Sequence, residues 1–357
     1  MTEKAKTIIL TGGGSAGHVT PNIALISKLQ ENNWSIHYIG TEHGIEKKLI
    51  SPLNFPYHVI PSGKLRRYFS WQNFIDPFKV LAGVAKSIAL CLKIKPCVIF
   101  SKGGFVSLPV VIAGYLTRTP VILHESDLTP GLANKLSFPF AKKILLTFDE
   151  TKKYFKNKNK LVVTGTPIRP QLFLGNKQKG LAFAGLDNTK PVILIICGSL
   201  GSKLINETVR HILPELLTHY SVIHICGKGQ INADLMKEKN YKQFEYVHDE
   251  LADVFACADL VISRSGANSL SELLALRKVA ILIPLSKKAS RGDQIDNARF
   301  AEQKGLSLVL PEEMLNEKTL LEKINTLLLN KESFQQALSQ FSMKNSVDLI
   351  FQSVCER

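Results

Sequence analysis

The chain has 357 residues, of which 45% are hydrophobic and 21% are charged, and its formal net charge is +15. This length and composition exclude a disordered or fibrous chain and predict a globular protein of two domains. The longest apolar stretch, residues 78–100, is interrupted by four lysines and a proline, so it cannot span a bilayer. Six residues without an apolar segment precede the first strand, so we expect no export signal.

The positive charge is distributed unevenly. Residues 1–168 contain 22 basic and 9 acidic residues, whereas residues 169–357 contain 23 and 21. A basic first half predicts contact with a polyanion or an anionic surface, and a lysine-rich solvated surface is the alternative. No nucleic-acid recognition motif accompanies the charge, so we expect no nucleic-acid partner.

Six cysteines, none in a Cys-x-x-Cys pair, predict buried free thiols in a reducing compartment. No His/Cys/Asp cluster has the spacing of a structural zinc site, so we expect no metal and no cofactor.

In the first half, short apolar runs alternate with helix-like segments. The runs at residues 7–10, 35–39, 96–100, 121–124 and 143–147 predict strands, and the segments 21–31, 44–50 and 108–116 predict helices. This alternation is typical of a parallel sheet with helices on both faces.

The same pattern restarts after a Pro-, Gly- and Asn-containing segment, residues 165–190, which we interpret as a linker. "PVILIICGSLGSKLIN" at residues 191–206 again combines a strand, a glycine turn and a helix. Further strands are predicted at residues 221–226, 245–247, 260–263, 279–284 and 306–310. We therefore predict an α/β protein with two Rossmann-like domains that face each other across a cleft.

Four glycine loops each follow a predicted strand and enter a predicted helix. They are "LTGGGSAGHVTP" (10–21), "FSKGGFVSLP" (100–109), "CGSLGS" (197–202) and "ISRSGANSLSE" (262–272). Glycines allow close approach of the backbone, and a helix N-terminus offers free N–H groups, which together suit a phosphate. Ser199, Ser265 and Asn268 add further donors, so we predict that the protein binds phosphate groups.

Gly12, Gly14 and Gly17 also satisfy the dinucleotide fingerprint, but a nicotinamide cofactor is disfavoured. The only acidic candidate for its ribose is Glu42, which comes several residues after the second strand. The chain also has a second glycine-loop domain in place of a separate catalytic domain.

Carboxylates and amides near the fourth loop suit a sugar nucleotide. Glu272 lies one to two helical turns after Gly266, where it can reach a ribose diol; a surface glutamate is the alternative. Asp293, Gln294 and Asn297 suit sugar hydroxyls, and a helix N-cap with a polar face is the alternative.

These motifs resemble, over the whole chain and in family order, the MurG-type glycosyltransferases of bacterial cell-wall synthesis. The resemblance rests on "GGGSAGHVTP", "PSGKLRRYFS", "FSKGGFVSLPVV", "HESDLTPGLANK", "TGTPIR", "CGSLGSKLIN", "ISRSGANSLSE" and "RGDQIDNA". It implies the GT-B fold, with an acceptor- and membrane-facing domain at 1–168 plus a C-terminal helix near 343–357, and a UDP-GlcNAc-binding domain at 169–342. It also implies inverting transfer of N-acetylglucosamine from UDP-GlcNAc to undecaprenyl-diphosphate-MurNAc-pentapeptide (lipid I), which yields lipid II.

The resemblance implies a role for individual residues. His18 matches a histidine proposed as general base or as an organiser of the acceptor, and Asp127, where many members have asparagine, is the competing base. Arg169 matches an arginine near the donor phosphates, and the backbone at Val247 and His248 matches the segment that reads uracil. The remaining predicted UDP-GlcNAc contacts are Gly13, Gly14, Ser15, Gly17, His18, Ser199, Ser265, Gly266, Glu272, Asp293, Gln294 and Asn297.

The acceptor diphosphate is expected at Gly14, Gly103 and Gly104. Metal-dependent sugar transferases hold a cation with an Asp-x-Asp motif, which this sequence lacks. We therefore expect the helix after Gly266, Arg169 and Arg264 to stabilise the leaving UDP.

Basic and aromatic residues alternate in residues 63–86, a combination that suits an anionic lipid interface; an amphipathic helix packed on the core is the alternative. We therefore expect peripheral attachment to the cytoplasmic face of the cell membrane, with cell-wall synthesis or division proteins as further candidate partners. The predicted membrane contacts are Arg66, Arg67, Phe69, Trp71, Phe74, Phe78 and Lys79.

Two other functions remain open from the sequence. One is a GT-B glycosyltransferase with another membrane lipid acceptor, such as a diacylglycerol glucosyltransferase. The other is a non-catalytic UDP-sugar sensor.

Overall fold

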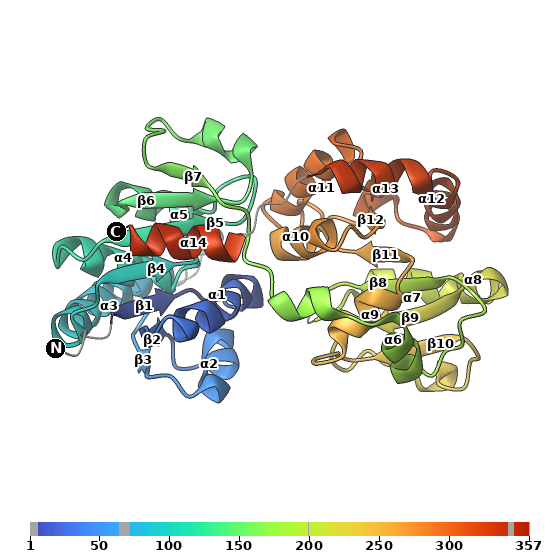
Figure 1. Ribbon diagram of the computed structural model, residues 1–357, viewed down its shortest axis with the longest axis horizontal. Coiled ribbons are helices and arrows are strands. Elements are labelled where there is room, and N and C mark those ends of the chain that lie inside the picture. The colour runs from blue at the N-terminus through green and yellow to red at the C-terminus, as the bar shows by residue number, and fades with distance from the viewer. Residues whose placement is uncertain (1–5, 64–71, 199, 342–345, 357) are drawn as a thin grey trace. The chain divides into compact units, whose positions relative to one another are not determined.

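A computed structural model describes residues 6–63, 72–198, 200–341 and 346–356, with side chains of residues 72–75 excluded. The chain forms two compact units. Unit 1 consists of Met1–Ile168 and Lys344–Arg357, and unit 2 of Arg169–Met343. Each unit is built on its own parallel sheet (Figure 1).

Unit 1 contains a seven-stranded parallel sheet in the order β3-β2-β1-β4-β5-β6-β7. Its central strands are continuous apolar runs because helices cover both faces of the sheet. Ile8 and Leu10 point to one core, whereas Ile9 packs with Ile39 and Ile99 in the other. The strands are β1 (Thr7–Thr11), β2 (Ser35–Gly40), β3 (Tyr57–Val59), β4 (Val98–Ser101), β5 (Val121–Glu125), β6 (Lys143–Leu146) and β7 (Leu161–Val163).

The helices of unit 1 connect these parallel strands, apart from α14, which follows unit 2 in the sequence. Pro21 and Pro109 both lie in the first turn of their helices, where no backbone N–H is required. The helices are α1 (Thr20–Glu31), α2 (Ile45–Ile50), α3 (Gln72–Ile94), α4 (Ser107–Leu116), α5 (Leu132–Ser137) and α14 (Ser346–Cys355).

The C-terminal helix α14 completes the core of unit 1, and Figure 1 shows it in red among the blue and green elements of that unit. Ile350 and Val354 are fully buried in the same cluster as Leu25 and Leu29 of α1. The Ser346 hydroxyl donates to the Thr166 carbonyl at 2.5 Å. The last residues of the chain are therefore part of the first unit.

Unit 2 contains a six-stranded parallel sheet in the order β10-β9-β8-β11-β12-β13. Its strands are β8 (Val192–Ile196), β9 (Ser221–Ile225), β10 (Tyr241–Phe244), β11 (Leu260–Ser263), β12 (Ala280–Leu282) and β13 (Leu308–Val309). Its helices are α6 (Lys177–Ala184), α7 (Lys203–His211), α8 (Leu213–His219), α9 (Leu251–Cys257), α10 (Ala267–Ala275), α11 (Asp293–Gln303), α12 (Glu317–Leu329) and α13 (Lys331–Gln340).

Short 3-10 turns complete the two units. They are Ala16–His18, Ser51–Leu53, Phe138–Phe140, Asp149–Tyr154, Pro170–Leu174, Ala233–Leu235 and Glu312–Met314.

Two sequence predictions differ from the structure, and two short strands were not predicted. The predicted strand at 245–247 is a loop, because β10 ends at Phe244. Much of the predicted linker is folded: α6 begins after Asn176, whose side chain accepts from the Lys179 N–H at 3.1 Å, and packs against α9. The edge strands β3 and β7 were not predicted, since three residues are too few for a clear apolar run.

All six cysteines are free thiols, as predicted, but their burial differs. Cys91, Cys197, Cys226 and Cys257 are buried, whereas Cys355 is exposed.

Gly104 provides a test of the tight packing between the loops of unit 1. It has φ +84°, and a Cβ placed on it would lie 2.1 Å from the Gly13 carbonyl oxygen. Gly104→Ala should destabilise the protein by more than about 3 kcal/mol, since backbone overlap adds to the roughly 1–2 kcal/mol of a left-handed L-residue.

The matched control is Gly305→Ala, which has φ +67° and nothing within 4 Å of the new Cβ. It should lose only about 1–2 kcal/mol in denaturant unfolding. Equal losses for the two variants would contradict the packing argument.

Candidate functional site

Loops of unit 1 meet at the point where the strand order of its sheet reverses. β1 and β4 are neighbours, yet the elements that follow them diverge to β2 and β5, which leaves a crevice at their carboxyl ends. The Gly13 N–H donates to the Gly103 carbonyl at 3.4 Å, so the first two glycine loops touch there. Gly14, Gly103 and Gly104 were predicted to contact the acceptor diphosphate and Gly13 to contact UDP-GlcNAc, and the structure brings the two loops that carry these glycines together.

His18 lies in a 3-10 turn between the first glycine loop and α1. The turn spans Ala16–His18, and α1 begins only at Thr20. The Nδ1 atom of His18 lies 2.7 Å from Ser15 Oγ, which orients the ring. Gly14, Ser15 and Gly17 are exposed and His18 is half-buried, so this turn is accessible.

A buried carboxylate, that of Glu46, accepts a hydrogen bond from the backbone of the first glycine loop. Glu46 is fully buried and accepts from the Gly14 N–H at 3.2 Å, the Thr41 N–H at 3.1 Å and the Thr41 hydroxyl at 2.5 Å. One backbone donor of the loop is therefore already paired within the protein. The sequence analysis did not identify Glu46, because it lies in a short helix with no motif of its own.

A buried lysine lies at the base of the second glycine loop. Lys102 is 1% exposed, and its Nζ lies 2.6 Å from His124 Nδ1 and 2.5 Å from Ser126 Oγ. Burial lowers the pKa of Lys102 from 10.5 to about 7, while Glu125 and Asp127 act to raise it. The sequence analysis did not identify this residue, although a lysine directly after a buried strand and before two glycines is an available signal.

Glu125 shapes the loop that presents Asp127. It is 3% exposed and accepts from the Asp127 N–H at 3.0 Å, the Gly131 N–H at 3.1 Å and Asn134 Nδ2 at 2.8 Å. Asp127 itself is half-buried. The β5 loop is thus held by a carboxylate that the sequence analysis did not single out.

Unit 2 repeats this arrangement at its own reversal point, between β8 and β11. The Ser263 hydroxyl donates to the Ile196 carbonyl at 2.8 Å and Arg264 Nη2 to Ser202 Oγ at 2.8 Å, so the third and fourth glycine loops are joined. Ser199 lies outside the described residues. Gly266 is the N-cap of α10 and has no Cβ neighbour within 4 Å, which leaves the helix N-terminus approachable.

Arg264 is committed to the structure of unit 2. Its guanidinium pairs with Glu312 and donates from Nη1 to the Ile283 carbonyl at 3.2 Å, in addition to Ser202. The expected contribution of Arg264 to leaving-group stabilisation therefore competes with three structural contacts.

Arg169 and Glu272 form an ion pair although they are far apart in sequence. Arg169 Nη2 lies 3.5 Å from Glu272 Oε1. Burial raises the pKa of Glu272, and the Arg169 charge acts against that rise. The pair places two predicted donor-site residues side by side near the start of α10.

The predicted sugar-contact residues pack around the fourth loop. Ser265 is fully buried and donates to the Gln294 carbonyl at 2.8 Å, and Asn297 Nδ2 donates to the Ser265 carbonyl at 3.1 Å. The Leu285 N–H donates to Gln294 Oε1 at 3.0 Å. Asp293 begins α11 and pairs with Arg291 at 3.1 Å. Ser265 and Asn297 thus shape the loop, and their direct contact with a sugar nucleotide stays a prediction.

Val247 and His248 lie in the loop between β10 and α9. Val247 is buried, His248 is exposed, and the rings of Tyr246 and His248 are 4.3 Å apart between centroids. The His248 carbonyl accepts from the Leu251 N–H at 3.4 Å, which fixes the loop at the start of α9.

The predicted membrane segment is described only in part. Arg66, Arg67, Phe69 and Trp71 lie outside the described residues, as does the side chain of Phe74. In α3, Phe78 is 71% exposed and Leu81 is 65% exposed. The exposed apolar residues recur with helical spacing, and exposed lysines flank them: the first group is Phe78, Leu81, Ala82, Ala85, Ala89 and Leu92, and the second is Lys79, Lys86 and Lys93. The helix packs on α4 by its other face, so its exposed face carries both apolar side chains and lysines.

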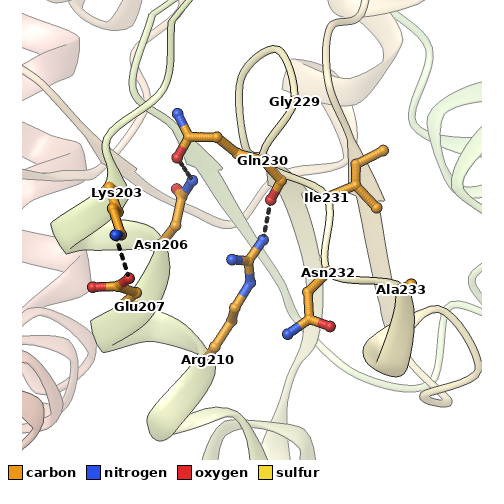
Figure 2. A pocket seen from close by; sticks show the side chains of 9 residues that line it. All are labelled: Lys203, Asn206, Glu207, Arg210, Gly229, Gln230, Ile231, Asn232 and Ala233. Atoms are coloured by element: carbon orange, nitrogen blue, oxygen red, sulfur yellow. Dashed lines mark hydrogen bonds and ion pairs between the residues drawn. The ribbon is translucent and has the colours of Figure 1, made fainter.

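A pocket of about 580 Å³ in unit 2 is lined by residues that the sequence did not predict as part of a site (Figure 2). It is formed by α7 and the loop after β9. Figure 2 shows Arg210 reaching from α7 to the Gln230 carbonyl, at 2.5 Å. Its Nη2 also donates to Gln243 Oε1 at 3.0 Å, so Arg210 holds this loop in place.

Within the ranges given above, no helix has both the length and the hydropathy that crossing a bilayer requires. The same part of the chain has no group of three or more His, Cys, Asp or Glu side chains arranged to hold a metal ion.

Comparison with known proteins agrees with the fold. Residues 8–146 match the glycosyltransferase family 28 N-terminal domain, and residues 192–352 match the family 28 C-terminal domain. Over 99% of its length the chain resembles the crystal structure of Acinetobacter baumannii MurG, with a TM-score of 0.77, 24% identity and 100% of that chain covered. UDP-GlcNAc 2-epimerase from Neisseria meningitidis is similar in fold, with a TM-score of 0.68 and 14% identity, covering 99% of this chain and 100% of the epimerase. The matches to both family 28 domains make this chain a glycosyltransferase, and its two parallel sheets have the GT-B fold.

Relatives with more than half of their residues identical to this chain identify the family within this class. The chain is 53% identical over 351 residues to the UDP-N-acetylglucosamine–N-acetylmuramyl-(pentapeptide) pyrophosphoryl-undecaprenol N-acetylglucosamine transferase 2 of Bacillus cereus, covering 98% of this chain and 99% of that protein. It is 56% identical over 344 residues to the transferase of this name from Clostridium novyi, covering 96% of each. The chain therefore belongs to the MurG family of glycosyltransferase family 28.

Proposed function

We propose that this protein transfers N-acetylglucosamine from UDP-GlcNAc to the 4-hydroxyl of MurNAc in lipid I, forming lipid II with inversion at the anomeric carbon. The single observation that carries the proposal is the 53% identity, over nearly the full length of both chains, to a transferase named for this reaction. The paired glycine loops in each unit support it, because both substrates carry a diphosphate.

Unit 2 is proposed to bind the donor. The N-terminus of α10 after Gly266, together with Arg169, offers positive charge to the diphosphate, and Glu272 accepts from the ribose hydroxyls. Binding would replace the Arg169–Glu272 contact by contacts of each partner with the nucleotide.

Unit 1 is proposed to bind the acceptor at the loops around Gly14, Gly103 and Gly104. As the 4-hydroxyl oxygen bonds to C1 of the sugar, the bond from C1 to the UDP oxygen breaks and the hydroxyl proton moves to a base. With the Nδ1–H of His18 donating to Ser15, the Nε2 lone pair would accept that proton. The negative charge develops on UDP, where the unit 2 donors stabilise it.

The protein is proposed to act at the cytoplasmic face of the membrane, attached peripherally through residues 63–86 and the outer face of α3. Apolar side chains such as Phe78 and Leu81 would enter the headgroup region while the flanking lysines contact anionic lipids. Further cell-wall synthesis or division proteins remain candidate partners.

A transfer assay separates this function from its alternatives. Labelled UDP-GlcNAc and UDP-glucose are each incubated with lipid I, and separately with diacylglycerol. Label from UDP-GlcNAc should appear only in the lipid I product. Transfer from UDP-glucose to diacylglycerol would favour another lipid glycosyltransferase, and UDP-GlcNAc binding without any transfer would favour a sensor.

Glu272→Ala should raise the KM for UDP-GlcNAc by about tenfold to a hundredfold, because buried hydrogen bonds to a ligand are lost. Glu272→Gln keeps one acceptor and should have a smaller effect. The control is Glu302→Ala, an exposed glutamate of the same unit. An unchanged donor KM in a folded Glu272→Ala variant would remove this residue from the donor site.

His18→Ala should lower kcat by about 10²–10⁴-fold while UDP affinity, measured by calorimetry, stays constant. His43→Ala, which removes an exposed histidine of the same unit, is the matched control. If only the acceptor KM rises, then His18 orients the acceptor and Asp127 is the better candidate for the base.

Binding to vesicles should depend on both charge and apolar surface of α3. Replacing Lys79, Lys86 and Lys93 by Gln should weaken sedimentation with anionic vesicles, because each lysine near the surface contributes about 1 kcal/mol. Phe78→Ser with Leu81→Ser should weaken the part of binding that high salt does not remove. A control that replaces the exposed Lys237, Lys239 and Lys318 by Gln should sediment like the parent protein. Equal sedimentation of all variants would exclude α3 as the contact.

A further inference from the structure

Lys102 lies where the carboxyl ends of three neighbouring strands of unit 1 meet. It follows β4 directly, and a Cβ placed on Gly12, after β1, would lie 3.0 Å from the Lys102 Cβ. Its Nζ contacts His124 in β5 and Ser126 just after β5, at 2.6 and 2.5 Å. The side chain therefore links the first glycine loop, the second glycine loop and the Asp127 loop.

The hydrogen bonds assign the charge in this cluster to the lysine. The His124 Nε2–H donates to the Gly165 carbonyl at 2.7 Å, so its Nδ1 carries the lone pair and accepts from Lys102. Burial and the Lys102 charge hold the pKa of His124 well below its ordinary value. His124 is thus a neutral acceptor, and the positive charge lies on the ammonium group beside Ser126.

A buried ammonium ion is costly unless negative groups compensate it. The charged groups that act on Lys102 are Glu125 at the end of β5 and Asp127 beyond it. Glu46 lies beside the first loop, where its carboxylate accepts from the Gly14 N–H. A diphosphate at the two glycine loops would add negative charge next to this cluster.

We propose that Lys102 is a positioning residue whose buried ammonium ion holds the Ser126–Asp127 loop and electrostatically supports a diphosphate group bound at the first two glycine loops. The assignment of that diphosphate to the acceptor rests on the proposed function. Binding of a diphosphate stabilises the charged form of Lys102, so the protein takes up a proton when it binds near or above neutral pH.

The first test is the pH dependence of kcat/KM for lipid I, which reports the ionisation of the free enzyme. Burial lowers the pKa of Lys102 to about 7, so the value for the parent protein should fall as pH rises above this point and Lys102 loses its charge. Lys102→Met should be about ten- to a hundredfold less efficient at pH 6 and should lack this decline. Lys102→Arg keeps a permanent charge and should show no decline up to pH 9.

The matched control is Lys48→Met, which removes one exposed positive charge from the same unit and should retain the parent profile. UDP affinity should be the same in all variants. An alkaline decline that persists in Lys102→Met would overturn the proposal, even with reduced activity, because the loss would then be structural. Equal efficiency of Lys102→Met and the parent protein would also overturn it.

A second test does not depend on catalysis. Inorganic diphosphate is titrated into the protein at pH 7.5 by calorimetry in two buffers of different ionisation enthalpy. The parent protein should take up a fraction of a proton per diphosphate, and Lys102→Met should take up less. Equal proton uptake by the parent protein and Lys102→Met would overturn the role of Lys102. If proton uptake differs as expected but no label is transferred to lipid I, then the role of Lys102 in binding diphosphate stands and the proposed function is refuted.

The pH dependence of the free energy of unfolding tests independently whether Lys102 titrates while buried. Between about pH 7 and the ordinary pKa of 10.5, the unfolded chain carries a proton on Lys102 that the folded protein has lost. The unfolded state then binds more protons, so the stability contributed at this site rises with pH across that window. The rise should be shallower in Lys102→Met, and identical slopes would contradict a buried titrating lysine.

Discussion

The central constraint in this protein is the reversal of strand order in each parallel sheet. The chain continues from β1 to one side of the sheet and from β4 to the other, which leaves a crevice at the carboxyl ends of these two neighbouring strands. The same holds for β8 and β11 in unit 2. Backbone donors and helix N-termini collect at these two points, and the glycines, the buried serines and the ion pairs described above are arranged around them.

The two reversal points are stabilised by different chemistry. In unit 1, Glu46 and Glu125 are buried carboxylates that accept backbone and amide N–H groups from the loops. In unit 2, the Arg264 guanidinium donates to Ser202 Oγ and to the Ile283 carbonyl, and it pairs with Glu312. Glu46 thus holds the first glycine loop from outside its motif, Glu125 holds the Asp127 loop, and Arg264 holds the fourth loop from within its own sequence.

The sequence allowed the prediction of both sheets and of the glycine loops, because continuous apolar strands and glycine turns are local patterns. It did not reveal Lys102 or Glu46 as parts of the site. Their importance depends on partners far along the chain, such as His124 for Lys102 and Gly14 for Glu46, and no local spacing encodes those contacts. Local signals also failed at one edge of the unit 2 sheet, where β10 ends before the predicted strand begins. They failed again at α6, a helix that forms within a segment whose composition is typical of a linker.

The return of α14 to unit 1 has a consequence for biosynthesis. Ile350 and Val354, which emerge from the ribosome after all of unit 2, fill the core beside Leu25 and Leu29, which emerge before unit 2. Domains generally fold as units and from the N-terminus during synthesis. In this chain unit 1 lacks part of its core until α14 has been translated, which happens only after all of Arg169–Met343. A nascent chain therefore exposes the apolar face of α1 throughout the synthesis of unit 2, and this face is the surface that a folding chaperone would have to cover.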